Sequence, residues 1–285
     1  MRTWTFAKGH GTKNDFVILA DRNNLVPVSE DDVRFLCDRR GGVGGDGLLR
    51  VTLASSIPEW NGEPGLWFMD YRNADGSIAE MCGNGLRVFV RYLLEEDLAT
   101  GERIEVATRA GLRSAWPQAD GSIRTSMGAV TLVGDEVTVV HAGHSWPATK
   151  VDVGNPHAVV FLDEHEDGEQ PVALGSLELF HAPAWSPSEV FPQGVNVEFV
   201  EVVTDDHVRM RVFERGSGET LSCGTGTVSV AAAHLARQGR SEGQVRVDVP
   251  GGTLHIEITD GDAFITGPAV VVAHGQVQLP GPDPR

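Results

Sequence analysis

Short runs of β-branched and aromatic residues recur along the chain, and Gly, Asp and Asn residues separate them. This alternation of apolar runs and turn-forming residues is typical of β-strands joined by tight connections. We therefore expect a protein made mainly of strands. The clearest candidates are residues 16–19, 66–71, 104–108, 137–140, 158–162 and 208–213.

Three segments have the helical spacing of apolar residues instead. The first follows Ser29, a suitable N-cap with Asp32 three residues on, and should end at Gly41 and Gly42. The second begins just after Cys82, and the third begins just after Cys223 and stops at Gly239, a natural C-terminal cap.

Strands followed by one central helix occur twice, which indicates an internal duplication rather than a parallel sheet with alternating helices. Cys, Gly, any residue and Gly match in register at Cys82 and at Cys223. Asn14 and Asn155 each lie 68 residues before one of these cysteines. We predict an α+β protein of two pseudo-symmetric domains, residues 1–120 and 121–268, with a strand from 269–285 returning to the first.

The composition narrows the possible partners. Of 285 residues, 41% are hydrophobic and 22% charged, and the net charge of −17 argues against binding to nucleic acid or an anionic membrane. No apolar stretch resembles a signal sequence or a membrane span, so we expect a cytoplasmic protein. Three cysteines without close spacing argue against a disulfide framework, a zinc site or a redox dithiol.

A cysteine at the start of a helix lies near the positive end of the helix dipole, where its thiolate is favoured and its pKa can fall below about 8.5. Such a thiol can serve as a base. The flanking glycines let the backbone approach a ligand, and the first-turn N–H groups can bind a carboxylate. Two such groups suffice to invert a stereocentre beside a carboxylate, one removing a proton and the other delivering one.

Simpler interpretations apply to several residues. Cys37 has apolar neighbours on a predicted helix, so we interpret it as a small buried hydrophobic residue. The glycine-rich segment 41–47 lacks the ending of a phosphate-binding loop. Asparagine is common beside turns for backbone reasons, and Glu214 with Arg215 could be a surface pair or could hold the charged groups of a substrate.

Six ordered blocks across almost the whole chain resemble the diaminopimelate epimerase family. They are HGTKNDFVIL from His10, DRRGGVGGDGLL from Asp38, NADGSIAEMCGNGLR from Asn73, GNPHAVVF from Gly154, GVNVEFV from Gly194 and ERGSGETLSCGTGT from Glu214. The resemblance implies two domains, each a mainly antiparallel sheet or barrel wrapped around a central helix. It also implies interconversion of LL- and meso-diaminopimelate for lysine and peptidoglycan, by a homodimer without pyridoxal phosphate, another cofactor or a metal.

The same resemblance implies roles for individual residues. Cys82 and Cys223 would be the two acid/base groups, and His157 and Glu214 would orient or tune the thiols. The residues that would bind substrate are Asn14, Asn73, Gly83, Asn84, Asn155, Asn196, Glu214, Arg215, Gly224 and Thr225.

Two positions depart from the family pattern. Lys13 stands where a second glycine is common, and Gly47 stands where a glutamine is common, so we expect Asn14 and Asn73 to carry more of the substrate binding.

The nearest rival, a proline racemase-type enzyme, usually has His at the position of Asn84. A phenazine-biosynthesis isomerase generally lacks the cysteine pair. A non-catalytic amino-acid binding protein or thiol redox protein is the alternative from another class.

Overall fold

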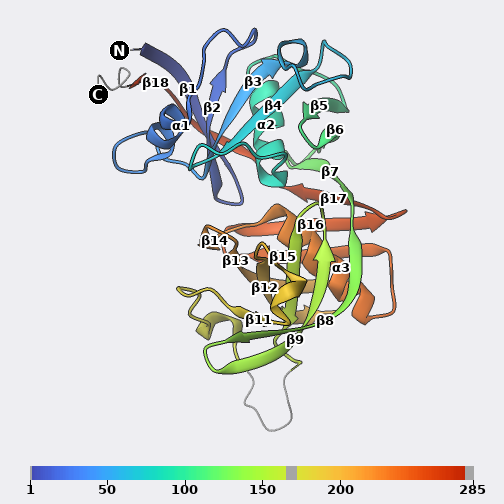
Figure 1. The fold of residues 1–285 in the computed structure, drawn as a ribbon. Helices are drawn as coiled ribbons and strands as arrows, with labels where there is room; N and C mark the ends of the chain where they lie inside the picture. Colours follow the sequence, from blue (N-terminus) through green and yellow to red (C-terminus); the bar gives the residue numbers. More distant parts are fainter. Residues whose placement is uncertain (1, 165–171, 280–285) are drawn as a thin grey trace. The chain divides into compact units, whose positions relative to one another are not determined.

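The computed structural model describes residues 2–164 and 172–279, and the tail expected at 280–285 lies outside these ranges. The chain forms two compact units (Figure 1). Unit 1 is Met1–Thr125 with Gly267–Arg285, and unit 2 is Ser126–Thr266. None of the described helices is both long and apolar enough to cross a membrane.

Unit 1 is a mixed sheet around one helix. Its strands are β1 (Arg2–Gly11), β2 (Asn14–Ala20), β3 (Gly47–Leu53), β4 (Trp67–Asn73), β5 (Ile104–Thr108), β6 (Gly111–Pro117), β7 (Ile123–Ala129, which crosses the unit boundary) and β18 (Val270–Leu279). Its helices are α1 (Glu30–Cys37), α2 (Gly83–Glu95) and the short 3-10 turn η1 (Ala54–Ser56). Strand β18 pairs antiparallel with β1 along almost its whole length, so the end of the chain completes unit 1.

Unit 2 repeats this plan. Its strands are β8 (Thr131–His141), β9 (His144–Asp152), β10 (Pro156–Phe161), β11 (Ala184–Ser186), β12 (Asn196–Thr204), β13 (His207–Glu214), β14 (Gly218–Thr220), β15 (Gly243–Val249), β16 (Gly252–Thr259) and β17 (Asp262–Gly267). Its one α-helix in the described residues is α3 (Gly224–Arg237), and the 3-10 turns are η2 (Leu174–Ser176) and η3 (Ser188–Val190).

The order of strand pairings is the same in both units. From β1 to β6 the pairings alternate between antiparallel and parallel, and the series β9, β10, β12, β13, β15 and β16 alternates in the same way. Helix α2 follows β4, and α3 follows β13 and the short β14. The internal repeat predicted from the two Cys-Gly segments is therefore confirmed in the topology.

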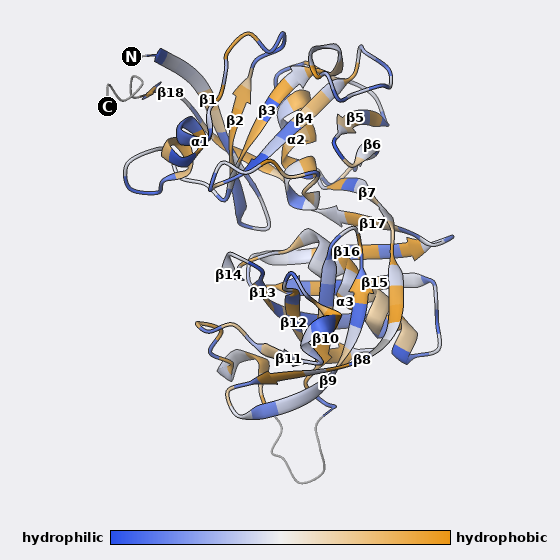
Figure 2. Ribbon diagram, viewed as in Figure 1, coloured by the Kyte–Doolittle hydropathy of each residue, from blue (hydrophilic) through white to orange (hydrophobic). Residues whose placement is uncertain are grey.

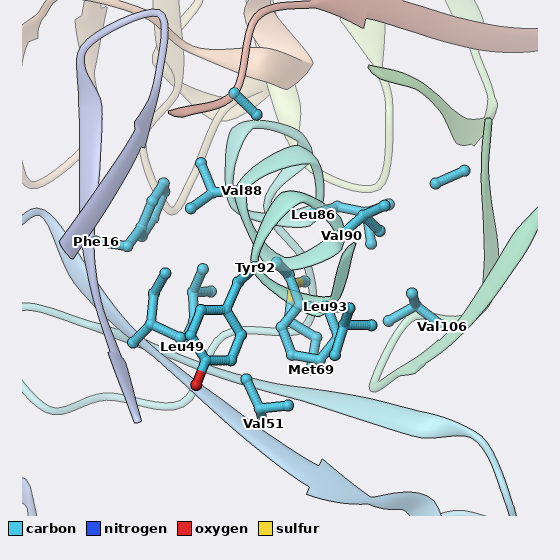
Figure 3. Packing of buried hydrophobic residues seen from close by; sticks show 14 of the residues in the cluster. Phe16, Leu49, Val51, Met69, Leu86, Val88, Val90, Tyr92, Leu93 and Val106 are labelled. Atoms are coloured by element: carbon cyan, nitrogen blue, oxygen red, sulfur yellow. The ribbon is translucent and has the colours of Figure 1, made fainter. Parts of the chain in front are cut away.

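The two central helices are buried because they are apolar around most of their circumference. Helix α2 packs against β1, β2, β3, β4 and β18, and α3 packs against β9, β10, β12, β13, β15 and β16. Figure 3 shows Leu86, Val88, Val90, Tyr92 and Leu93 of α2 among side chains from β2, β3, β4 and β5. Figure 2 shows orange segments, the colour of hydrophobic residues, in α2 and α3 beside paler and blue ones. Each sheet thus surrounds a buried helix whose first residue follows a cysteine.

Helix α1 begins as predicted but ends earlier. Ser29 is the N-cap and forms a capping box with Asp32. The helix ends at Cys37 rather than at Gly41 and Gly42, so that part of the prediction is wrong. The reason is Asp38, whose carboxylate accepts hydrogen bonds from the N–H groups of Arg40 and Gly41, both at 2.7 Å, and so replaces the helical turn.

The predicted strands coincide with observed ones. Residues 104–108 match β5, and the other five runs each overlap one strand, with ends that differ by a few residues. Helix α3 ends at Arg237, and Gly239 takes a φ of +69°, the left-handed conformation that suits a C-terminal cap.

Candidate active site

Each predicted cysteine is the N-cap of a central helix. Cys82 and Cys223 both have an extended backbone, and each Sγ accepts a hydrogen bond at 3.4 Å from the third helical residue, Gly85 or Gly226. The matching geometry shows that the repeat extends from the sheet to the thiol. Gly83 and Gly224 are the first residues of the two helices.

In unit 1 the thiol of Cys82 faces two asparagines, Asn14 and Asn84. We call these three residues the Cys82 site. The Sγ atom of Cys82 lies 3.7 Å from Asn14 Oδ1, and Asn84 Nδ2 donates to the same oxygen at 3.2 Å. Asn14 Nδ2 donates to Asp46 Oδ2 at 2.7 Å. Both ends of the Asn14 amide are therefore held, and its oxygen is turned toward the thiol.

A buried arginine lies behind this site. Arg87 is fully buried on α2 and donates to Asn84 Oδ1 at 2.6 Å and to Gly83 O at 3.3 Å. Burial lowers the pKa of Arg87 to about 10, while a thiolate at Cys82 acts in the opposite direction. The guanidinium therefore stays charged at neutral pH and places a cation beneath Cys82.

The two departures from the family pattern have structural counterparts. Lys13 lies in the two-residue turn between β1 and β2 with a φ of +62°, a conformation that glycine adopts more readily. A Cβ atom at Gly47 would lie 2.6 Å from Arg72 O, so a larger residue would require the adjoining strand β4 to move. Asn73, opposite Gly47 in the sheet, bonds to Ser77 Oγ at 3.0 Å.

The thiol of unit 2 lies in a different environment. Cys223 is only 6% exposed, and its Sγ lies 3.5 Å from Thr225 Oγ1. Burial raises the pKa of Cys223 well above its ordinary value, and the negative charges of Glu214 and Glu198 add to this effect. The hydrogen bonds from Thr225 and Gly226 act against it without reversing it. We call Cys223 and Thr225, with the adjoining His157 and Glu198, the Cys223 site.

His157 joins two other polar residues in unit 2. Its Nδ1 atom lies 2.7 Å from Glu198 Oε1, and its Nε2 atom lies 3.0 Å from Asn155 Oδ1. The side chains of His157 and Glu198 are fully buried. The candidate residues Asn155 and His157 are thus brought together, and Glu198 joins them.

The remaining candidates lie around the ends of β12 and β13. Asn196 Oδ1 accepts a hydrogen bond from the backbone N–H of Arg215 at 2.9 Å, and Asn196 Nδ2 donates to Pro156 O. The exposed Arg215 side chain bonds to Gln193 O, and Glu214 accepts a hydrogen bond from Thr220. Glu214 and Arg215 are therefore each bonded to a residue outside the pair.

The sequence interpretation did not find Asp46, Arg87 or Glu198. Arg87 and Glu198 each stand within an apolar run, between Leu86 and Val88 and between Val197 and Phe199. A charged residue in a segment that is otherwise buried needs a partner, and this signal could have identified both.

The structure also bears on Cys37 and on the glycine-rich segment 41–47, for which the sequence favoured simpler interpretations. Cys37 is buried, and burial raises its pKa to about 12, as expected for an unreactive thiol. In the glycine-rich segment, the N–H groups of residues 42–46 all donate to backbone carbonyls, so they form no phosphate cradle.

Comparison with known proteins gives the same family along the chain. The family model described as Diaminopimelate epimerase matches residues 6–133 and 149–277. A diaminopimelate epimerase of Streptomyces coelicolor is 46% identical over 95% of this chain and 94% of its own length. One from Corynebacterium glutamicum is 44% identical over 97% of this chain and 99% of its own, and one from Thermobifida fusca is 45% identical over 96% and 98%.

Solved structures share the fold at low sequence identity. A hydroxyproline epimerase from Agrobacterium vitis has a TM-score of 0.67 at 16% identity, covering 99% of this chain and 94% of that one. A PhzF-family phenazine biosynthesis protein from Bacillus anthracis has the same TM-score and identity, covering 98% and 100%. These similarities establish the two-domain fold alone. With the family match and the close relatives, they show that this chain is an isomerase that belongs to the diaminopimelate epimerase family.

Proposed function

We propose that this protein converts LL-diaminopimelate to meso-diaminopimelate, with Cys82 and Cys223 as the two acid/base groups. The observation that carries the proposal is the repeated N-cap geometry, in which two equivalent helices each begin at a thiol. Family membership supports the substrate.

The chemistry follows from what a thiol can do at a helix N-terminus. One cysteine, as thiolate, removes the α-proton of the substrate and becomes a thiol. The other cysteine, as thiol, delivers its proton to the opposite face of the same carbon and becomes a thiolate. The positive ends of α2 and α3 would stabilise the negative charge that develops on the reacting carboxylate. Protons and charge balance without a cofactor, and the reverse reaction starts from the exchanged protonation states.

The binding residues divide into two groups in this proposal. Gly83, Asn84, Gly224 and Thr225, at the two helix starts, would hold the reacting carboxylate and amino groups. His157 and Glu214 would tune the thiols, and both lie in unit 2, as Cys223 does. The rest of the substrate would bind to Asn14, Asn73, Asn155, Asn196, Glu214 and Arg215.

The family resemblance extends the proposal to the setting of the reaction. We propose that the product serves lysine and peptidoglycan precursor synthesis in the cytoplasm, and that the protein acts as a homodimer. Sedimentation of the purified protein at micromolar concentration tests the last point, and a single species of 30.6 kDa would contradict it.

The central experiment is turnover in deuterated water. We expect solvent deuterium at the α-carbon of diaminopimelate, and we expect Cys82→Ala and Cys223→Ala each to abolish epimerisation. Cys37→Ala is the matched control and should keep normal turnover, because Cys37 is a buried thiol at the end of α1 rather than at the start of a central helix. Near-normal turnover by either of the first two variants would refute the two-base mechanism. Inversion of L-proline but not of LL-diaminopimelate would refute the substrate.

A further inference from the structure

Glu198 is a buried carboxylate that the reaction as described does not use. It is the third residue of β12, between β10 and β13 in the sheet, and its exposed fraction is 0%. Its register partners are Val159 and Val212, both apolar and buried. A carboxylate in such a place costs free energy unless other groups compensate its charge.

The charge of Glu198 is only partly compensated by hydrogen bonds. Its Oε1 atom lies 2.7 Å from His157 Nδ1, but its Oε2 atom is buried and has no hydrogen-bond partner among the residues that the structure describes. Half of the carboxylate therefore faces the interior without a donor, and its field acts on nearby groups at low dielectric.

The nearest reactive group lies across one glycine. A Cβ atom at Gly226 would lie 2.7 Å from Glu198 Oε1 and 3.3 Å from Cys223 Sγ. The carboxylate and the thiol thus lie within about 6 Å of each other, close enough for one negative charge to disfavour a second.

The repeat shows that this arrangement is not a requirement of the fold. In unit 1 the third residue of β3 is Leu49, and its Cδ2 atom lies 3.3 Å from a Cβ placed at Gly85, the counterpart of Gly226. An apolar side chain therefore fills this position under α2, and an anion fills it under α3. Arg87, the buried cation of α2, has Val228 at the same helical position of α3.

The titratable groups around Cys223 come from three strands packed against α3. They are His157 of β10, Glu198 of β12 and Glu214 of β13. Both carboxylates raise the pKa of Cys223, and His157 Nδ1 lies 2.7 Å from Glu198 Oε1.

We propose that Glu198 is a positioning residue that, through its charge and its hydrogen bond to His157, keeps Cys223 in the neutral thiol form. The Cys223 site then begins a catalytic cycle as the proton donor. This inference rests on the proposed function for its role in catalysis, but the protonation state of Cys223 can be measured without substrate.

The test is the pH dependence of iodoacetamide alkylation, resolved by peptide mass spectrometry so that Cys82 and Cys223 are followed in one sample. In the unmodified protein, the alkylation midpoint of Cys223 should lie above about pH 8.5, the value for a free thiol. A midpoint at or below that value would overturn the proposal whatever the variants do.

Two variants then isolate the carboxylate. Glu198→Gln keeps the shape, and Glu198→Leu introduces the type of side chain that unit 1 has at this position. Either variant should lower the alkylation midpoint of Cys223 and raise its alkylation rate at pH 8 by at least about threefold. The reason is that lowering the midpoint by about one pH unit increases the thiolate fraction about tenfold when the pH is below the midpoint. The Cys82 rate in the same sample should change by less than about twofold.

Glu201→Gln is the matched control, since Glu201 lies on the same strand but its side chain is 42% exposed and paired with Arg209. It should leave both cysteines unchanged. An unchanged or raised midpoint of Cys223 in a folded Glu198 variant would overturn the inference. If the protein failed to epimerise diaminopimelate while the midpoint moved as expected, the proposed function alone would fall.

Discussion

At the scale of single residues, the N-cap cysteines are notable because Ser, Thr, Asp and Asn cap helices better. A thiol is a weak acceptor, and the N–H of Gly85 or Gly226 reaches it only at 3.4 Å. Both central helices therefore forgo part of the stability that a hydroxyl or carboxylate cap would give. The same choice at two equivalent positions favours a chemical role for the sulfur over a structural one.

The buried charge beside each thiol is the main difference between the two sites. Arg87 lies behind Cys82, and Glu198 lies beside Cys223. A cation favours a neighbouring thiolate and an anion favours a neighbouring thiol. Two sites with the same backbone geometry can therefore rest in different protonation states, as the proposed reaction, with one base and one acid, requires.

Replacing Arg87 with methionine tests the cationic side of this contrast. The change removes the Arg87 donor to Asn84 Oδ1 and Gly83 O. Loss of these buried hydrogen bonds should lower the free energy of unfolding by about 1–3 kcal/mol. It also removes the charge that favours the Cys82 thiolate, so alkylation of Cys82 at pH 7 should slow by at least about threefold.

The control for this variant is Arg91→Met, one turn further along α2. Arg91 bonds to Ala269 O and Gly121 O and is half-buried, so its loss should lower stability without changing the reactivity of Cys82. Equal alkylation rates of Cys82 in the Arg87 variant and the unmodified protein would contradict the electrostatic role of Arg87.

At the scale of elements, the sequence predicts best where local chemistry sets the boundary. Ser29 and the two cysteines mark helix starts because the cap and the glycines are contiguous with the helix. The end of α1 escapes prediction because the side chain of Asp38 folds back on the next residues. Asp46 and Glu198 escape prediction because their partners, Asn14 and His157, come from other strands, and only the register of the sheet brings them together. Arg87 differs, since its partners Gly83 and Asn84 lie on its own helix.

One carboxylate links three strands of unit 2 and makes its stability depend on pH. Asp248 of β15 accepts hydrogen bonds from Thr253 of β16, from Arg246 and from His207 of β13. Burial would raise the pKa of Asp248, but these hydrogen bonds outweigh it and lower the pKa to about 2. Since the folded value is below the unfolded value of about 3.9, the stabilisation is present above about pH 4 and is lost as the pH falls toward about 2.

Asp248→Asn should therefore lower the melting temperature at pH 7 but have a diminishing effect in acid. We expect a loss on the order of 1 kcal/mol at pH 7 after solvent screening, or about 2–4 °C. Melting curves followed by circular dichroism between pH 7 and pH 2 measure the difference from the unmodified protein. Asp262→Asn, at an exposed position on β17, is the control. A difference that stays constant down to pH 2 would contradict this account.

At the scale of the whole molecule, the chain order gives the two units different degrees of independence. Every strand of unit 2 lies within one continuous segment, whereas unit 1 needs β18 from the far end of the chain. Strand β18 covers β1 and contributes Leu279, Val277 and Val271 to the cores of unit 1. Ala269, just before β18, also accepts the hydrogen bond from Arg91 of α2.

Fragments of the chain should show this difference directly. A fragment of residues 123–267 should fold alone and melt cooperatively, because it holds β7 to β17 complete. A fragment of residues 1–125 should not, since it exposes the edge of β1 and loses apolar contacts worth about 1.5–3 kcal/mol for each fully buried side chain. Joining residues 267–279 to this fragment through a short Gly/Ser linker should restore a cooperative transition, because β7 and β17 are paired and bring the two ends together. Circular dichroism melts and hydrogen exchange at β1 distinguish these outcomes, and a cooperative melt by residues 1–125 alone would show that β18 is dispensable for the fold of unit 1.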